Sequence, residues 1–486
     1  MLIGGLLTFL AAIWPRKQSA VKGPESGSAG SSRTASADSN FSVSASQRFS
    51  FFNVSGVTRL MRWPSFWFSL LFLLYLTIQA CNPSITVVHG EGGWWVERMT
   101  PPLAEWLPTS VRSEYEQMNA FRVLEWFAAS FVLMWGIWAG ITCRKTALIL
   151  LWSLVVSGTA MAMVAILQDL TESDKVLWTL KSANDNFWGS FFYRNQGAAY
   201  LNLMLVGIGV LYFYHAKKAE ESAQSGGPHF LLFIFFALVA ASVGLALSRG
   251  CILFASVLSI AFVLGVILRT LMATRRILSS LSISLLVAGL LGAGAFFMIQ
   301  QIDVEAIQER FGDVGATIEN ADQDARTLSS RATYEMAQDR SLMGWGAGSF
   351  RYIFPIYQQK IPELFYSRYH QKKGEWLGRK VYHYAHNDIL QFWAEYGAIG
   401  CSLLVLTFGS LIISAFQPFS LSASSILHFP LSTFHLIVGF ATIIAHAFIE
   451  FILNSPAYWV ALIGLLTGIA KLFQLEGARR KRHSTT

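Results

Sequence analysis

The stretch FLLFIFFALVAASVGLALSRGCILFASVLSIAFVLGVIL, residues 230–268, contains one charged residue, Arg249, between two long apolar runs. The runs cover 230–248 and 251–268, and each is about long enough to cross the roughly 30 Å hydrocarbon core of a bilayer as a helix. A helix is also the only open-ended element that satisfies its own backbone in lipid. The stretch therefore predicts two membrane-spanning helices joined by a tight turn at 248–250.

The composition of the whole chain agrees with this interpretation. Hydrophobic residues make up 53% of the 486 residues and charged residues only 14%, against roughly 25% charged in an average soluble protein. A soluble fold of this composition would expose large apolar patches. We therefore predict an all-α, polytopic membrane helix bundle of about ten spans, with one large, mostly helical, extracytoplasmic loop. The spans are expected near residues 65–84, 121–141, 146–168, 197–214, 230–248, 251–268, 279–299, 388–415, 431–451 and 457–474.

Basic residues near the span ends predict the orientation. The clusters are Arg59 and Arg62, Arg144 and Lys145, Lys217 and Lys218, Arg269 with Arg275 and Arg276, and Arg479, Arg480, Lys481 and Arg482. All of them fall on one side if ten spans alternate, and that side is the cytoplasm because short cytoplasmic loops carry the excess of Lys and Arg. Both termini are then cytoplasmic, and the loops at 85–120, 169–196 and 300–387 lie on the other side. No basic stripe of the kind that binds nucleic acid is evident.

The chain therefore divides into five predicted parts. They are a disordered cytoplasmic N-terminal extension (1–60), spans one to seven (61–299), an extracytoplasmic loop domain (300–387), spans eight to ten (388–474) and a basic cytoplasmic tail (475–486).

Polar residues gather where the large loop re-enters the membrane, in VYHYAHNDILQFWAEYGAIG, residues 381–400. Such a group is costly at the mouth of a span unless it lines a wet cavity. We select His386 as a candidate base, because a neutral imidazole is suited to taking a proton from a hydroxyl near neutral pH. Glu395 is a candidate for orienting it, and His383 and Asn387 are candidate substrate contacts. The alternative for any single histidine is a structural role.

Three arginines lie on the predicted extracytoplasmic side, where short loops usually carry few positive charges. They are Arg194 in FFYRNQGAAYL (191–201), Arg249 in the turn at 248–250, and Arg331 in the amphipathic stretch 326–341. A guanidinium group matches phosphate oxygens with a rigid fork and stays protonated. Converging arginines would suit a diphosphate, whereas isolated ones would simply reach toward the membrane surface.

Further candidates flank these residues. Glu450 shares a helical face with His446 in HAFIEF (446–451) and is expected within reach of an arginine or in an interhelical hydrogen bond. Trp345, in the glycine-rich MGWGAGSF (343–350), and Tyr384 are candidate sugar contacts, because aromatic rings in such loops often stack on sugars. A small packed lid is the alternative.

The sequence gives little sign of a metal or disulfide site. The four cysteines, Cys81, Cys143, Cys251 and Cys401, are far apart and include no CxxC pair. Asp322-Gln323-Asp324 has the DxD form that some sugar transferases use for Mg²⁺ or Mn²⁺, but three residues in a polar loop are a weak signal.

Several segments together resemble the O-antigen ligase and polymerase superfamily of bacterial membrane glycosyltransferases. His386-Asn387 is followed after nine residues by Gly397 and then by Gly400, and SSRATYEMAQDRSLMGWGAGSF (329–350) is similar to the Arg-led helix and glycine-rich turn of that family. The FYRNQGAAYL, LSRG and HAFIEFILNSPAYWVALIGLLTG (446–468) segments also look like family landmarks, although the family often has Asp at the position of Glu450. The resemblance covers roughly 190–470.

The resemblance implies an inverting glycosyltransferase of the bacterial inner membrane that needs no metal or other cofactor. Its donor would be a glycan on undecaprenyl diphosphate, displayed on the periplasmic face. The acceptor would be lipid A-core, another glycan or a protein hydroxyl. His386 would be the base or acceptor-orienting group, and Arg194, Arg249 and Arg331 would hold the diphosphate. A flippase or transporter for lipid-linked glycans is the alternative from another class.

Overall fold

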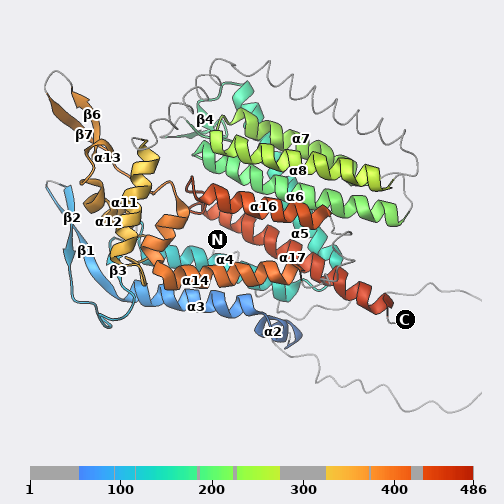
Figure 1. Ribbon diagram of the computed structural model, residues 1–486, viewed down its shortest axis with the longest axis horizontal. Helices are drawn as coiled ribbons and strands as arrows, with labels where there is room; N and C mark the ends of the chain where they lie inside the picture. Colours follow the sequence, from blue (N-terminus) through green and yellow to red (C-terminus); the bar gives the residue numbers. More distant parts are fainter. Residues whose placement is uncertain are drawn as a thin grey trace, which may run out of the picture.

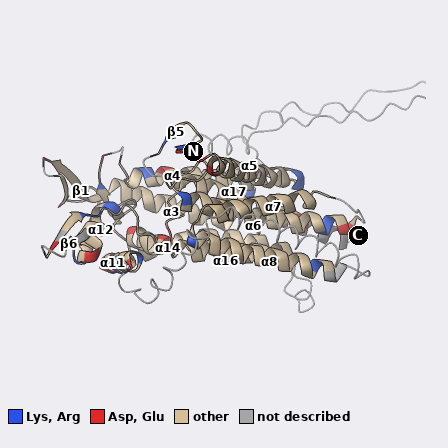
Figure 2. Cartoon of the chain, turned by 90° about the horizontal axis from the view of Figure 1, so that it is seen from above, with Lys and Arg blue, Asp and Glu red and all other residues tan. Residues whose placement is uncertain are grey.

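The computed structural model describes residues 54–273 and 324–484, except residues 92, 115–116, 183–185, 223–226, 371–373 and 417–430. Within these residues, long helices run side by side and carry a smaller, mixed cap at one end (Figure 1). Charged residues concentrate toward the two ends of the long helices, and the middle of the helices is mostly apolar (Figure 2).

Seven helices in the described part of the chain are long and apolar enough to cross a membrane. They are α3 (Pro64–Cys81), α4 (Ala120–Gly140), α5 (Arg144–Leu170), α6 (Arg194–Glu221), α8 (Arg249–Ala273), α14 (Asp388–Phe416) and α17 (Pro456–Ser484). Two further apolar helices, α7 (His229–Leu245) and α16 (Leu431–Ala447), are shorter. These helices correspond to nine of the ten expected spans, and the chain is a multi-pass membrane protein. The expected span at 279–299 lies outside the described residues, so a total of ten stays a prediction.

Helix α6 lies at the centre of the bundle. Its most apolar window is 89% buried, compared with 33% for the corresponding window of α5. Leu203, Met204 and Leu205 are consecutive and all fully enclosed, so α6 is covered on every side. A helix that is apolar all round is expected in such a position.

The cap forms a second apolar core above the ends of the spans. It consists of α11 (Ala325–Asp339), α12 (Phe350–Gln358), α13 (Pro362–Phe365) and strands β1 (Pro83–Gly90), β2 (Gly93–Arg98), β3 (Ser110–Arg112), β6 (Tyr366–His370) and β7 (Glu375–Arg379). Phe350 and Phe354 stack with ring centroids 4.5 Å apart, and both rings are buried against Met336 of α11. The described helices of the large loop therefore pack into a common apolar core with Ile85 of β1 and Val111 of β3.

The described residues are mostly helical, as expected, and the loops add three small sheets. Strand β1 pairs antiparallel with β2 and parallel with β3, β4 (Lys175–Val176) pairs with β5 (Leu180–Lys181), and β6 pairs with β7. The segment TVVHGEGGWWV (86–96) has β-branched residues before a glycine-rich stretch and two tryptophans and a valine after it. That pattern favours a hairpin.

Helix α14 is broken at Gly397, which has φ of +63° and ψ of −177°. The break frees backbone groups that the cap then satisfies: Trp345 N donates to Ala394 O at 2.8 Å, and Ala398 N donates to Ser341 O at 2.8 Å. A Cβ atom on Gly397 would lie 2.3 Å from the carbonyl oxygen of Leu342. The glycine therefore permits both the positive φ and the close approach of the cap.

Candidate functional site

A cavity of about 390 Å³ lies where α6, α8, α11 and the end of α16 meet, at the cap end of the bundle. It is lined by Arg194, Asn195, Leu247, Ser248, Arg249, Gly250, Asp324, Arg326, His446, Ile449 and Glu450. The structure thus brings together two of the three selected arginines, Arg194 and Arg249, with the selected carboxylate of Glu450. These residues are far apart in the sequence.

Glu450 is the centre of the polar contacts in this cavity. Its carboxylate receives hydrogen bonds from Asn195 Nδ2 at 2.6 Å and Arg326 Nη2 at 3.1 Å, and its Oε1 lies 2.8 Å from Nδ1 of His386. The Glu450 side chain is only 4% exposed. A carboxylate this deeply buried requires such partners, because an unpaired buried charge is strongly unfavourable.

These contacts keep Glu450 ionised. Burial raises the pKa of its carboxyl, but the hydrogen bond with His386 and the positive charge of Arg326 outweigh burial, so the pKa lies below its ordinary value of 4.5. An ionised carboxylate can only accept hydrogen bonds. Because Glu450 contacts Nδ1 of His386, that nitrogen carries a proton and donates a hydrogen bond to the carboxylate. A neutral His386 then carries its lone pair on Nε2.

The His386 ring is held in one orientation by its surroundings. Its backbone has φ of +55°, which is costly for a residue other than glycine and persists only where neighbouring contacts enforce it. Here Gln391 Oε1 accepts from Ala385 N at 3.1 Å, and Ser329 Oγ donates to Ala385 O at 3.2 Å. The ring meets Phe451 edge-on at 4.8 Å.

The next two residues anchor the start of α14. Asn387 caps the helix, with Oδ1 accepting from Leu390 N at 3.1 Å. Asp388 is fully buried and accepts from Leu453 N at 2.7 Å and Asn454 Nδ2 at 2.6 Å. Both residues therefore fix the loop around His386, and the structure gives Asn387 this structural contact.

Glu395 does not reach His386 as we expected. Its carboxylate accepts from Gly348 N at 3.0 Å, Phe350 N at 3.2 Å and Gln391 Nε2 at 3.3 Å. It therefore holds the glycine-rich turn of the cap against α14 and affects the histidine loop only through Gln391. The orienting position expected for Glu395 is occupied by Glu450.

The arginines differ in their placement. Arg194 and Arg249 are the first residues of α6 and α8, so two helix N-termini, which favour anions, point at the cavity together with two guanidinium groups. Arg331 is exposed on α11 and does not line the cavity, and its side chain forms no ion pair or hydrogen bond with other described residues. Arg326, five residues earlier on α11, lines the cavity instead. Sequence reasoning missed Arg326, although ARTLSSR contains both arginines and one face of a helix can present only one of them.

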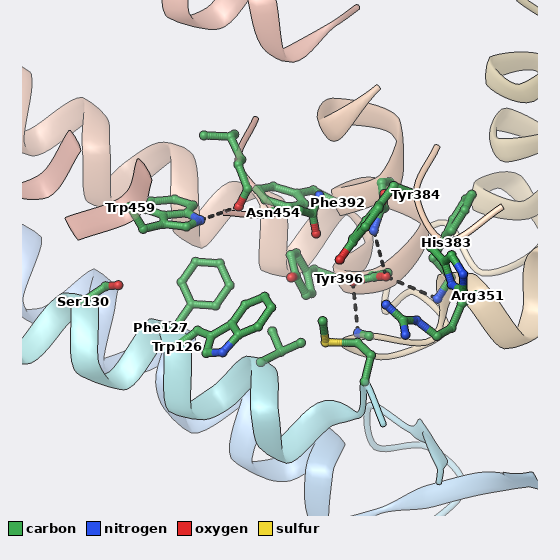
Figure 3. A pocket seen from close by; sticks show the side chains of 17 residues that line it. Trp126, Phe127, Ser130, Arg351, His383, Tyr384, Phe392, Tyr396, Asn454 and Trp459 are labelled. Atoms are coloured by element: carbon green, nitrogen blue, oxygen red, sulfur yellow. Dashed lines mark hydrogen bonds between the residues drawn. The ribbon is translucent and has the colours of Figure 1, made fainter. Parts of the chain in front are cut away.

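Tyr384, His383 and Arg351 border a neighbouring pocket of about 20 Å³, which is room for about one water molecule. Figure 3 shows these three side chains at one end of the pocket and the rings of Trp126 and Phe127 toward the other. Burial, together with the nearby charge of Arg351, lowers the pKa of His383.

The ring of Tyr384 connects this small pocket to His386. It stacks on Phe451 with centroids 4.7 Å apart, and Tyr193 stacks on Phe451 as well, at 5.1 Å. Phe451 also meets the His386 ring. The aromatic rings therefore form a rigid wall beside the histidine.

Trp345 lies inside the cap, away from the cavity. Its Nε1 donates to Met336 O at 2.8 Å, and the guanidinium group of Arg340 lies 4.3 Å from the ring centroid. These contacts favour the packed-lid alternative for Trp345.

In the part of the chain that the structure describes, no group of three or more His, Cys, Asp or Glu side chains is arranged to hold a metal. Asp324 caps α11, with Oδ2 accepting from Arg326 N at 3.0 Å and Thr327 N at 3.2 Å. Asp322 lies outside the described residues. All four cysteines are free thiols.

Comparison with known proteins adds one finding. No curated protein matches the chain. Residues 231–405 match the family model described as O-antigen ligase, and this range contains Arg249, Arg326 and His386, whereas Arg194 and Glu450 lie outside it. The match supports glycan transfer of the ligase or polymerase type, and it confirms the predicted resemblance of this chain to the O-antigen ligase and polymerase superfamily.

Proposed function

We propose that the protein transfers a glycan from a polyprenyl diphosphate donor to an acceptor hydroxyl, in the cavity formed by Arg194, Arg249, Arg326 and Glu450. The observation that carries this proposal is a cavity lined by three arginines and Glu450, whose carboxylate lies 2.8 Å from the imidazole of His386 just outside the lining. Arginines neutralise a diphosphate, and an imidazole removes a hydroxyl proton. Glycosyl transfer from a diphosphate requires neutralisation of the leaving group and removal of the acceptor proton, and these side chains can supply both.

The reaction replaces one bond to the anomeric carbon by another. The acceptor oxygen attacks this carbon from the side opposite the diphosphate, so the configuration inverts, and its proton passes to Nε2 of His386. The bond between the anomeric carbon and the diphosphate oxygen breaks, and the electron pair leaves with the diphosphate. Arg194 and Arg249 stabilise that developing charge, with Arg326 shared between Glu450 and the leaving group.

The residues that handle the substrates need no metal in this mechanism. Guanidinium groups and helix N-termini take over the neutralisation of phosphate charge. Glu450 stabilises the imidazolium that forms when His386 accepts the proton. Metal-independent, inverting transfer is accordingly part of the proposal.

The donor is undecaprenyl diphosphate-linked, and the reaction takes place on the periplasmic face of the bacterial inner membrane, with both termini in the cytoplasm. The basic clusters at the end of the bundle opposite the cap support this orientation. The acceptor is lipid A-core or another glycan; a protein hydroxyl fits the same chemistry.

The direct test is transfer by the purified protein in vesicles supplied with undecaprenyl diphosphate-linked glycan and a candidate acceptor. His386→Ala should lose transfer by about 10²-fold or more. The matched control is His89→Ala, because His89 is an exposed histidine of β1. Equal activity of His386→Ala and wild-type protein would reject the proposal. Movement of donor between leaflets that depends on His386, without transfer, would favour a flippase.

A further inference from the structure

A second cleft lies at the other end of α11 from the arginine-lined cavity and close to the end of α3. It has a volume of about 690 Å³. We name it the headgroup cleft, and its lining is formed by residues 84–85, 98–99, 101, 105, 107, 109 and 339–344. No residue of the headgroup cleft lines the cavity of the proposed transfer reaction.

The position of the cleft relative to the membrane follows from Asn82, the first residue after the apolar span α3. Asn82 Oδ1 accepts from Leu103 N at 2.9 Å, and Asn82 Nδ2 donates to Ala104 O at 2.9 Å and Pro108 O at 3.3 Å. These bonds attach the loop at 99–109, which forms one wall of the cleft, directly to the end of the span. The cleft therefore opens at the level where lipid headgroups lie.

Two arginines face this cleft without a carboxylate partner. Arg340 is held rigidly, because its Nη1 donates to Thr109 Oγ1 at 2.7 Å and its guanidinium group packs over Trp345. Arg98 is exposed at the end of β2 and forms no ion pair or hydrogen bond with other described residues. Burial and the nearby charge of Arg98 lower the pKa of Arg340. The two positive charges thus repel each other, and a bound anion would relieve the repulsion.

Large apolar side chains are exposed on Leu342, which lines the cleft, and on the loop at 99–109, which forms one of its walls. Trp106 is 76% exposed, Leu342 65% and Leu103 55%. Tryptophan is enriched at the membrane interface, where an apolar ring with one polar group is favoured. Apolar groups next to unpaired arginines match an amphiphile with an anionic head.

Two carboxylates complete the lining of the cleft. Asp339 accepts a hydrogen bond from the hydroxyl of Tyr357, and Glu105 has no ion-pair partner among the described residues. A headgroup that carries hydrogen-bond donors beside its phosphate, such as an ammonium or hydroxyl groups, satisfies both kinds of charge. A bare anion would satisfy only the arginines.

We propose that the headgroup cleft binds the phosphate-bearing headgroup of a membrane lipid, with Arg98 and Arg340 on the phosphate. The exposed side chains of Leu342 and of the loop at 99–109 then contact the lipid chains. Residues 339–344 form one wall of the cleft and also dock onto the break of α14, so a bound lipid would contact the segment that joins the cap to the membrane bundle.

The test measures lipid binding to the full-length, delipidated protein by native mass spectrometry, without donor or transfer. Short-chain phosphatidylethanolamine should bind, and Arg98→Gln should weaken binding about tenfold, the effect of losing a charge-assisted hydrogen bond. The control is Arg112→Gln, because Arg112 is an exposed arginine of β3 outside the cleft. Arg112→Gln should bind like the wild-type protein, and equal weakening in both variants would overturn the proposal.

Three further probes separate the possible sources of the phosphate. Diacylglycerol with the same chains should bind at least tenfold more weakly, and equal binding would overturn the role of the phosphate. Inorganic phosphate should also bind weakly, and affinity equal to that of the phospholipid would overturn the role of the chains. A monophosphorylated glycolipid that binds more tightly than phosphatidylethanolamine, and depends on Arg98, would support the proposal with a glycolipid as the natural ligand. Tighter binding of phosphatidylethanolamine than of the glycolipid would support the proposal with bulk membrane lipid as the natural ligand.

Discussion

Glu450 Oε1 lies 2.8 Å from Nδ1 of His386, although the two residues are 64 positions apart in the chain. The same carboxylate is bound by Arg326 and Asn195. Glu450 therefore couples the histidine to the cationic cavity, and its charge fixes which nitrogen of the imidazole stays free. In the proposed reaction this makes Glu450 a positioning residue, while His386 exchanges the proton.

Replacing Glu450 by Gln should remove the negative charge beside His386 with little change in side-chain size. The amide loses the negative charge that stabilises the imidazolium, so we expect transfer to fall by about 10²-fold or more, mainly in kcat. Native-like melting of the variant would verify folding. The pH profile of kcat should also change shape, and an unchanged rate and profile would argue that Glu450 is only structural.

Transfer should depend on the planar shape of the guanidinium groups at the starts of α6 and α8, and not on their positive charge alone. Arg249→Lys keeps the charge but loses the planar fork that binds two phosphate oxygens. We expect transfer to decrease about tenfold or more, the loss of one charge-assisted hydrogen bond, while membrane insertion is normal. Arg62→Lys is the control, because Arg62 is an exposed arginine outside the cavity. Full activity of Arg249→Lys in vesicles would count against diphosphate binding by Arg249.

The break in α14 gives a prediction about stability. Gly397→Ala places a side chain at φ of +63° and 2.3 Å from the Leu342 carbonyl, so we expect a loss of at least about 1–3 kcal/mol in the free energy of unfolding. Gly409→Ala is a matched control in the same helix, because its Cβ would meet nothing within 4 Å. Thermal melting in detergent compares the two variants, and similar melting temperatures would contradict the described junction.

The Arg326 contact gives a prediction about pH. The pKa of Glu450 lies below its ordinary value of 4.5, so its stabilising contribution is complete above that value and is lost as pH falls through the lower, folded-state pKa. Arg326→Gln removes one cause of the lowering and raises the pKa of Glu450. Its melting temperature should therefore fall by less than that of the wild-type protein, and level off at a higher pH, during titration from about pH 7 to about pH 3. Identical profiles would show that Arg326 does not act on Glu450.

The spans and two of the arginines were predictable because each has a local signature. Long apolar runs identify the helices. Arg194 and Arg249 stand out because they lie at the predicted extracytoplasmic ends of spans, where short loops carry few positive charges. His386 was found for a similar reason, since a polar group at the mouth of a span requires an explanation.

Pairing between distant segments was not predictable in the same way. Glu395 and Glu450 were both visible carboxylates, but only the three-dimensional arrangement shows that Glu395 binds the glycine-rich turn and Glu450 binds His386. Likewise, Arg326 and Arg331 share one helix, and its rotation about its axis decides which of them faces the cavity. Rotation depends on packing against α14, which no local pattern encodes.

The break at Gly397 also affects how the protein is anchored. Residues 398–416 alone extend about 28 Å at 1.5 Å per residue, close to the roughly 30 Å of hydrocarbon in a bilayer. The portion of α14 before the glycine is therefore not needed to hold the helix in lipid. A substitution before Gly397 can therefore change the chemistry of the cap end while residues 398–416 still span the bilayer.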